Sequence, residues 1–182
     1  MLQRMIGAAL FNAQTYEEVE ADQNALGQAL TVVVLVTICG AIGGLIGDIL
    51  DGATALGLLV GLCIGLAFGI VRWALWVTVI LMVGRGLLRT GNTETNWSEV
   101  GRVLGFAYTP GLLSIFSWIP GIGWLIWLVA FFWTLAAAIM GVRQAMDYDN
   151  TGRAILVVVI AGVVGFIPWG ILMLIQQAIL AG

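Results

Sequence analysis

Residues 55–84 read ALGLLVGLCIGLAFGIVRWALWVTVILMVG, and this stretch decides the class of the whole chain. As a helix it is about 45 Å long, whereas about 20 residues are enough to cross the hydrocarbon core of a bilayer. It contains no acidic residue and one basic residue, Arg72. The stretch therefore predicts a transmembrane helix with an arginine inside it, and such an arginine calls for a partner.

The composition of the other residues agrees with this class. Hydrophobic residues make up 61% of the 182-residue chain and charged residues 9%, against about 25% charged in a soluble domain. The net charge is -3, all seven basic residues are arginines, and they form no patch for nucleic acid. The chain has no histidine, and Cys39 and Cys63 both lie in apolar runs. We therefore expect an integral membrane protein with no metal site, no cofactor and no nucleic-acid partner.

The first 25 residues predict an amphipathic segment on the cytoplasmic membrane surface. Apolar side chains recur at helical spacing in residues 2–13, which is typical of a helix lying in the interface. Thr15 and Glu18 have the spacing of a capping box, so a second helix is expected to begin at Tyr16. Its first turns are acidic, which suits the positive end of a helix dipole.

Residues 26–182 predict an all-α bundle of five membrane spans. Polar segments or turns separate the apolar runs, and Asn96 with Glu99 forms a capping box before the third. Pro120 and Gly121 form a tight turn before the fourth. The predicted spans are residues 26–45, 55–84, 100–119, 122–142 and 154–176.

The arginines predict the orientation of the bundle, because basic loops stay in the cytoplasm. Arg4 precedes the first span, three arginines surround the loop between spans two and three, and two bracket the loop between spans four and five. The loops after spans one and three contain none. Five spans with a cytoplasmic N-terminus and an external C-terminus satisfy every loop.

Four glycines in the second span recur at every fourth position, namely Gly57, Gly61, Gly65 and Gly69. Residues four apart lie on one side of a helix, so these glycines predict a smooth stripe that another backbone can approach. We interpret the stripe as a helix-packing seam, either within the chain or between chains. A pore lining is the alternative.

Three segments of the chain resemble the bacterial members of the Yip1 (Ypt-interacting protein) domain family of five-span membrane proteins. They are YEEVEAD at residues 16–22, GFAYTP at residues 105–110, and VRQAMDYDNTGRA at residues 142–154, which includes Arg143, Asp147 and Arg153. The resemblance implies a multi-pass protein of the bacterial inner membrane, and the eukaryotic relatives in this family work through protein partners rather than catalysis. It implies no settled activity, and the long cytosolic N-terminal region of the eukaryotic relatives is missing from this sequence.

The candidate intramembrane site joins Arg72 to the third span. Arg72 and Tyr108 lie at similar depths, about 18 Å and about 14 Å from the cytoplasmic edge, if the two spans are antiparallel neighbours. Pro110 leaves the carbonyl of Phe106 without its helical donor. We expect Arg72 to contact the Phe106 carbonyl, Tyr108 or a lipid phosphate within a site that also includes Thr109. Alternatively, its long stem snorkels to the inner leaflet.

The expected function is that of a non-enzymatic membrane scaffold or adaptor, because no arrangement of nucleophile, base or paired carboxylates occurs in the chain. Its expected partners are membrane lipids, other membrane proteins or a second copy of itself. The alternative is a small transporter, channel or lipid-handling protein whose site lies near Arg72 and the proline-containing third and fifth spans.

Overall fold

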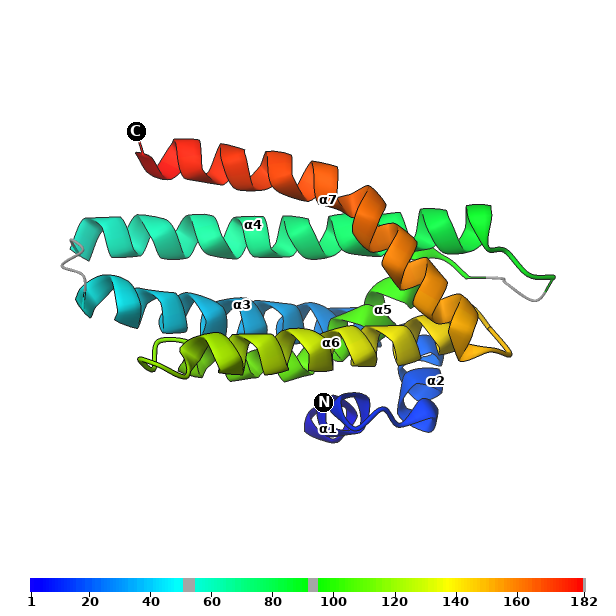
Figure 1. Ribbon diagram of the computed structural model, residues 1–182. Helices are drawn as coiled ribbons and strands as arrows, with labels where there is room; N and C mark the ends of the chain where they lie inside the picture. The colour runs from blue at the N-terminus through cyan, green and yellow to red at the C-terminus, as the bar shows by residue number, and fades with distance from the viewer. Residues whose placement is uncertain (51–54, 92–94, 182) are drawn as a thin grey trace.

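The computed structural model describes residues 1–50, 55–91 and 95–181, without the side chains of residues 47, 48, 50, 55–57 and 179–181. Every regular element within these ranges is helical, so the predicted all-α class is confirmed. Four long helices run side by side, and short helices pack against one end of them (Figure 1). The long helices are α3 (Ala25–Leu50), α4 (Ala55–Met82), α6 (Gly123–Ala145) and α7 (Thr151–Ala181).

These four helices are the candidate membrane spans, because each is long and apolar enough to cross a bilayer. Helix α4 continues through a π-helical turn, η1 (Val83–Leu87), so its apolar run extends from Leu58 to Leu87. Helix α7 contains Pro168 and changes direction near its middle (Figure 1). A proline inside a helix removes one backbone hydrogen bond and clashes with the preceding turn, which explains the bend.

The expected third span is not a continuous helix. Helix α5 (Trp97–Ala107) begins with the predicted capping box of Asn96 and Glu99, but it ends after eleven residues. The chain continues as a 3-10 helix, η2 (Thr109–Phe116). Pro110 lies at the start of η2, where it cannot continue the hydrogen-bonding pattern of α5. The prediction of one continuous helical span over residues 100–119 was therefore wrong, and the five-span count is not confirmed.

The N-terminal segment folds as two short helices, α1 (Leu2–Ala9) and α2 (Ala13–Ala21). The predicted start of the second helix at Tyr16 was wrong by three residues. Asn12 is its N-cap, and the Asn12 side chain accepts a hydrogen bond from the backbone N–H of Thr15. Asn12 supplies the same kind of acceptor as Thr15 and lies earlier in the chain, so the helix begins there.

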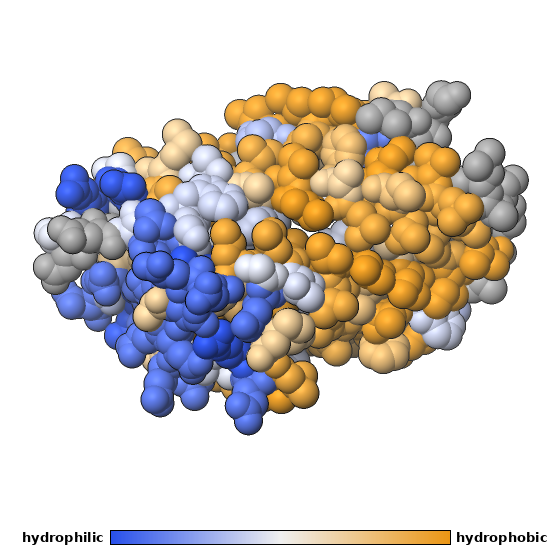
Figure 2. Space-filling view, turned by 180° about the vertical axis from the view of Figure 1, so that it is seen from behind, coloured by the Kyte–Doolittle hydropathy of each residue, from blue (hydrophilic) through white to orange (hydrophobic). Residues whose placement is uncertain are grey.

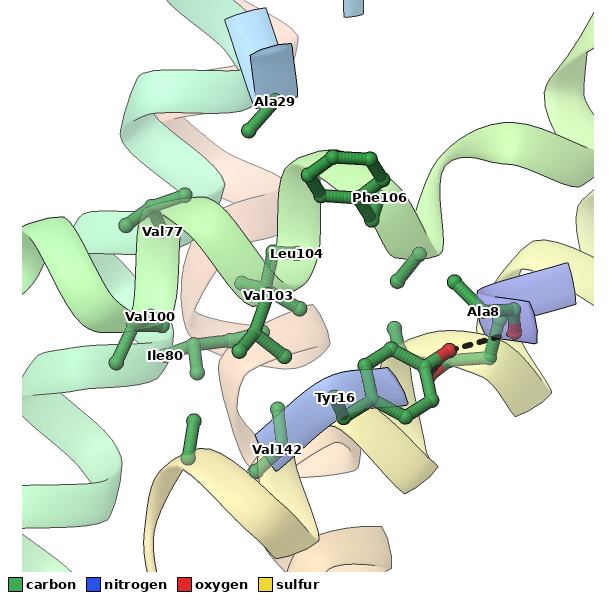
Figure 3. Packing of buried hydrophobic residues seen from close by; sticks show 14 of the residues in the cluster. Ala8, Tyr16, Ala29, Val77, Ile80, Val100, Val103, Leu104, Phe106 and Val142 are labelled. Carbon is green, nitrogen blue, oxygen red and sulfur yellow. Dashed lines mark hydrogen bonds between the residues drawn. The ribbon is translucent and has the colours of Figure 1, made fainter. Parts of the chain in front are cut away.

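Helix α5 is the centre of the buried core (Figure 3). Its residues from Val100 to Ala107 are all buried, and they pack against α3, α4, α6 and α2. Of the two glycines of α5, Gly105 lies closer to its neighbour, because a Cβ atom at this position would lie 2.6 Å from the Cβ of Ala29 on α3. Trp73 of α4 packs edge-on against Trp97, with ring centroids 5.6 Å apart. The core therefore lies at one end of the long helices.

The polar and apolar surfaces lie at opposite ends of the molecule (Figure 2). The arginines that flank the predicted cytoplasmic loops lie at the core end, with Arg85 and Arg89 after α4, Arg102 in α5, Arg143 in the last turn of α6 and Arg153 in the first turn of α7. The last turn of α3, the first turn of α4, the η2–α6 turn and the last turn of α7 lie toward the other end (Figure 1). The fold thus collects the arginine-bearing loops on one side.

Candidate functional site

Arg72 meets a polar partner that the sequence did not single out. Its Nη1 atom donates a 2.8 Å hydrogen bond to Oε1 of Gln176, which lies near the C-terminal end of α7. Both side chains are half-buried, and the contact joins residues 104 positions apart in the chain. The partner is a neutral amide, so this contact leaves the positive charge of Arg72 unbalanced.

The direction of Arg72 argues against snorkelling to the inner leaflet. Side chains on an α-helix lean toward its N-terminus, and the N-terminus of α4 lies at the end away from the arginine-bearing loops (Figure 1). Gln176 lies only five residues before the end of α7 and therefore toward that same far end. The guanidinium group is thus directed into the apolar half of the molecule.

The carbonyl of Phe106 is satisfied within its own motif rather than by Arg72. The Thr109 hydroxyl donates to this carbonyl over 2.6 Å, which replaces the donor that Pro110 lacks. Phe106, Thr109 and Pro110 are buried, and Tyr108 is half-buried within electrostatic range of Arg72. The structure thus brings Tyr108 and Arg72 together and assigns the other three residues to the junction of α5 and η2.

We expect the Arg72–Gln176 pair to behave as a unit when it is mutated. Gln176→Leu leaves Arg72 without its amide partner in an apolar setting, so this variant should lose about 1–2 kcal/mol of stability. The double variant Arg72→Leu/Gln176→Leu removes the stranded charge and should recover most of the loss. Thermal midpoints of the four proteins in one detergent give the coupling energy, and additive shifts would show that the hydrogen bond contributes nothing.

The glycine stripe does not form a packing seam along its length within this chain. A Cβ atom at Gly69 would lie 2.5 Å from Thr37 of α3, but at Gly61 and Gly65 it would meet no atom of the described residues within 4 Å. The surroundings of Gly57 lie outside the described residues. A four-residue step turns about 40° more than a full helical turn, so the stripe drifts away from α3. The face of α4 that carries Gly61 and Gly65 is therefore open in the described part of the chain.

The loop motif after α6 is tied to the end of α4. The Tyr148 hydroxyl lies 3.2 Å and 3.1 Å from the carbonyl oxygens of Gly84 and Leu88, and it can donate to either. The Nε atom of Arg143 donates to the Tyr148 carbonyl over 3.4 Å. Asp147 is exposed at a φ of 50°, and Arg153 is exposed. Of this motif, the structure therefore gives Arg143 and Tyr148 clear roles in fixing the loop.

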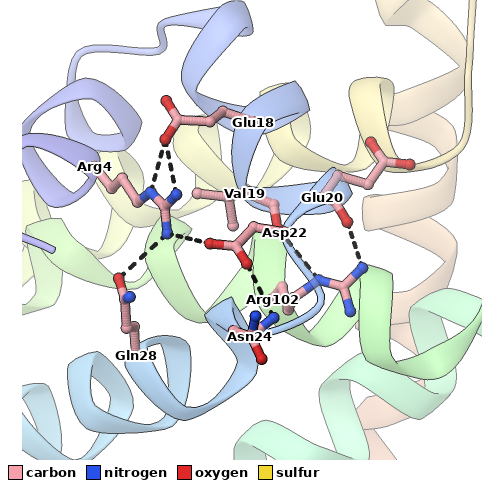
Figure 4. A network of polar contacts seen from close by, with 8 residues as sticks. All are labelled: Arg4, Glu18, Val19, Glu20, Asp22, Asn24, Gln28 and Arg102. Carbon is pink, nitrogen blue, oxygen red and sulfur yellow. Dashed lines mark hydrogen bonds and ion pairs between the residues drawn. The ribbon is translucent and has the colours of Figure 1, made fainter.

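Helix α2 is docked by two arginines that sequence reasoning treated only as charges (Figure 4). Arg102 is 4% exposed, and it donates through Nε to the Val19 carbonyl over 3.2 Å and through Nη2 to the Glu20 carbonyl. Both carbonyls belong to the last turn of α2, where the helix dipole favours a cation. The sequence shows an arginine in the third apolar run and an acidic segment before the first, but this does not identify backbone carbonyls of α2 as the acceptors.

Arg4 completes the docking from the other side. It donates to Oε1 of Glu18 and to Oδ2 of Asp22, each over 2.8 Å, and to Gln28 over 3.4 Å. The hydrogen bond from Arg4 lowers the pKa of Asp22. Arg4 therefore joins α1 to α2 and to the beginning of α3.

Beside α2 lies an open polar groove of about 690 Å³, lined by Glu17, Glu20, Arg143, Gln144, Asp147, Tyr148 and Asp149. Burial, and then the nearby carboxylates of Asp147 and Glu99, raise the pKa of Glu20 to about 7. Arg102 opposes this rise, but its guanidinium binds backbone carbonyls and the Glu20 carboxylate points away from it (Figure 4). Among the described residues, no three His, Cys, Asp or Glu side chains converge as a metal site.

The raised pKa of Glu20 predicts that the stability of the folded protein falls as the pH rises through the weakly acidic range. Below about pH 4.5 the residue is protonated in both states, and between 4.5 and 7 the unfolded chain releases its proton first. Because its half-buried side chain is partly screened, the total loss should be about 1–2 kcal/mol. Thermal midpoints between pH 4.5 and 7.5 should therefore depend less on pH in Glu20→Gln than in Asp149→Asn. Equal pH profiles would contradict the assignment.

Comparison with known families matches residues 7–172 to the Yip1 domain. No protein with a curated function and no solved structure matches the chain.

Proposed function

The chain belongs to the Yip1 domain family, and we propose that it acts as a non-enzymatic scaffold in a bacterial inner membrane. Members of the family are generally non-enzymatic membrane proteins. The scaffold would assemble with other membrane proteins, or with a second copy of this chain, through the face of α4 that carries Gly61 and Gly65. The N-terminus would be cytoplasmic and the C-terminus external, which puts the arginine-bearing loops on the cytoplasmic side.

The open glycine face of α4 carries this proposal. Gly61 and Gly65 lie in an apolar candidate span, and no atom of the described chain lies within 4 Å of where their Cβ atoms would be. Leu59, Val60 and Cys63 around them are exposed. Helices associate in a bilayer where small residues let backbones come close, so a smooth apolar face is suited to another helix.

We expect Gly65→Leu, and Gly61→Leu in the same way, to break up an assembly without unfolding the chain. A Cβ atom at either position meets no described atom of its own chain within 4 Å, and the remainder of a leucine side chain would occupy the space of a partner helix. The matched control is Gly44→Leu on α3, where the space is also open. Native mass spectrometry after gentle extraction should show a partner or a second copy with the wild type and Gly44→Leu only. An unchanged stoichiometry in both α4 variants would refute the proposal.

The Arg72–Gln176 contact supports a second candidate, the binding of an anionic lipid or small anion beside α4 and α7. A charge at membrane depth with a neutral partner is a common sign of a ligand path. If this candidate holds, native mass spectra of the wild type should retain an anionic molecule that Arg72→Leu loses, while Gly65→Leu keeps it. Equal spectra for the wild type and Arg72→Leu would exclude it.

A further inference from the structure

The C-terminal half of α6 lies beside a charged helix. The Tyr16 hydroxyl of α2 is 3.0 Å from the Ala137 carbonyl, and Gln144 Nε2 donates to Oε1 of Glu17 over 3.0 Å. Glu17 and Glu18 are exposed. Exposed carboxylates beside residues 137–145 require water at this level, because an ionised group in hydrocarbon is too costly. This half of α6 therefore lies outside the hydrocarbon core.

Helix α1 marks where the membrane surface crosses α6. It exposes Leu2, Ile6 and Leu10 at 69%, 51% and 67%, whereas Arg4 turns toward the carboxylates of α2. A helix with an exposed apolar face on one side and a charged side chain on the other lies flat in the membrane interface. The Trp133 Nε1 atom of α6 donates to the Ala9 carbonyl of α1 over 2.7 Å. The surface therefore meets α6 near Trp133.

From Trp133, α6 has too few residues left to cross the membrane. It begins at Gly123, ten residue steps away, which is about 15 Å of the about 30 Å that a crossing needs. Helix α6 forms a hairpin with η2. At the end of η2, Ser117 lies level with Gly43 of α3, because a Cβ atom at Gly43 would lie 2.5 Å from the Ser117 hydroxyl. Helix α3 then continues to Leu50, about 10 Å farther. The turn between η2 and α6 accordingly stops short of the ends of α3 and α4 (Figure 1).

We propose that α1 and the η2–α6 hairpin, residues 109–133, are seated in a single leaflet, the one on the arginine-bearing side, and that the hairpin turn ends inside the hydrocarbon core. Helices α3, α4 and α7 then cross the membrane, and α6 does not. The partner of the exposed Trp124, Trp127 and Phe132 side chains is the acyl chains of that leaflet. The hairpin turn carries no arginine, so the charge pattern fits this arrangement as well as five crossings.

Single cysteines test this placement in the full-length protein with Cys39→Ala and Cys63→Ala. The reporter is Ile122→Cys in the hairpin turn, and Trp124→Cys is a second reporter in case the first variant does not fold. Gly52→Cys between α3 and α4 and Asn150→Cys between α6 and α7 are the matched controls for the two sides. Each protein is treated with a membrane-impermeant maleimide in sealed vesicles of either orientation, and again in detergent.

We expect the two controls to be labelled from opposite sides. The hairpin reporters should be labelled at least tenfold less than the controls from either side, and they should react in detergent. Labelling of the reporters from the side that labels Gly52→Cys would overturn the proposal, because α6 would then cross the membrane. Labelling from the side of Asn150→Cys would also overturn it, because the turn would then lie at the surface.

Discussion

Replacing Arg102 by methionine is expected to release α2 from the bundle. Arg102 is 4% exposed, and it donates to the carbonyls of Val19 and Glu20 and to the Ser98 hydroxyl over 3.0 Å. Methionine keeps much of the apolar volume but none of the donors, so two carbonyls at the end of α2 lose their cation. Hydrogen bonds from a charged donor contribute about 1.5–3 kcal/mol each, and we expect a loss of about 3 kcal/mol.

Hydrogen exchange separates release of α2 from general unfolding. In Arg102→Met, amides of α2 should exchange much faster, while those of α3 and α4 stay protected. Arg153→Met is the control, because it also removes an arginine but from an exposed position. In Arg102→Lys, the exchange rates of the α2 amides should lie between those of the wild type and of Arg102→Met, since an ammonium group cannot reproduce the planar fork that reaches two carbonyls. Wild-type exchange in Arg102→Met would show that apolar packing alone holds α2.

The parts of the fold that depend on neighbouring residues could be predicted from the sequence. The capping box of Asn96 and Glu99 involves residues three apart, and the structure contains it. The long apolar runs likewise predicted α3, α4, α6 and α7, because hydrophobicity over about 20 residues is a local property. The helical form of residues 2–9 followed from the spacing of their apolar side chains.

Contacts between distant segments could not be predicted in the same way. Pro110 indicated a break in the third apolar run, but hydropathy alone favoured one span. Arg72 was recognised as needing a partner, yet its partner Gln176 is 104 residues away in the chain. A glycine stripe identifies a smooth face without naming what covers it, and only Gly69 among the stripe's described glycines meets α3 closely. Each of these outcomes depends on how helices are arranged in space.

Gly105→Ala is expected to destabilise the protein although it adds only a single methyl group to the core. The added Cβ atom would lie 2.6 Å from the Cβ of Ala29 and 3.1 Å from its backbone Cα and C atoms. Neither neighbour is the end of a flexible side chain, so α3 and α5 must move apart. Overpacking costs about 1–3 kcal/mol, whereas alanine gains about 1 kcal/mol over glycine in helix propensity. Because the contact is with backbone and Cβ atoms, the cost lies in the upper part of that range, and we expect a net loss of about 1–2 kcal/mol.

A matched glycine and a compensating substitution make this result specific to the contact. Gly27→Ala on α3 meets no atom within 4 Å and should be neutral or stabilising by up to about 1 kcal/mol. In Gly105→Ala/Ala29→Gly, the close Cβ pair is gone but the backbone of residue 29 remains, so stability should return in part. At this chain length, 1 kcal/mol shifts the thermal midpoint by about 2–4 °C, which detergent-phase thermal unfolding can measure. Equal midpoints for Gly105→Ala and Gly27→Ala would mean that α3 and α5 separate at no cost, so that α5 is not the packing centre of the core.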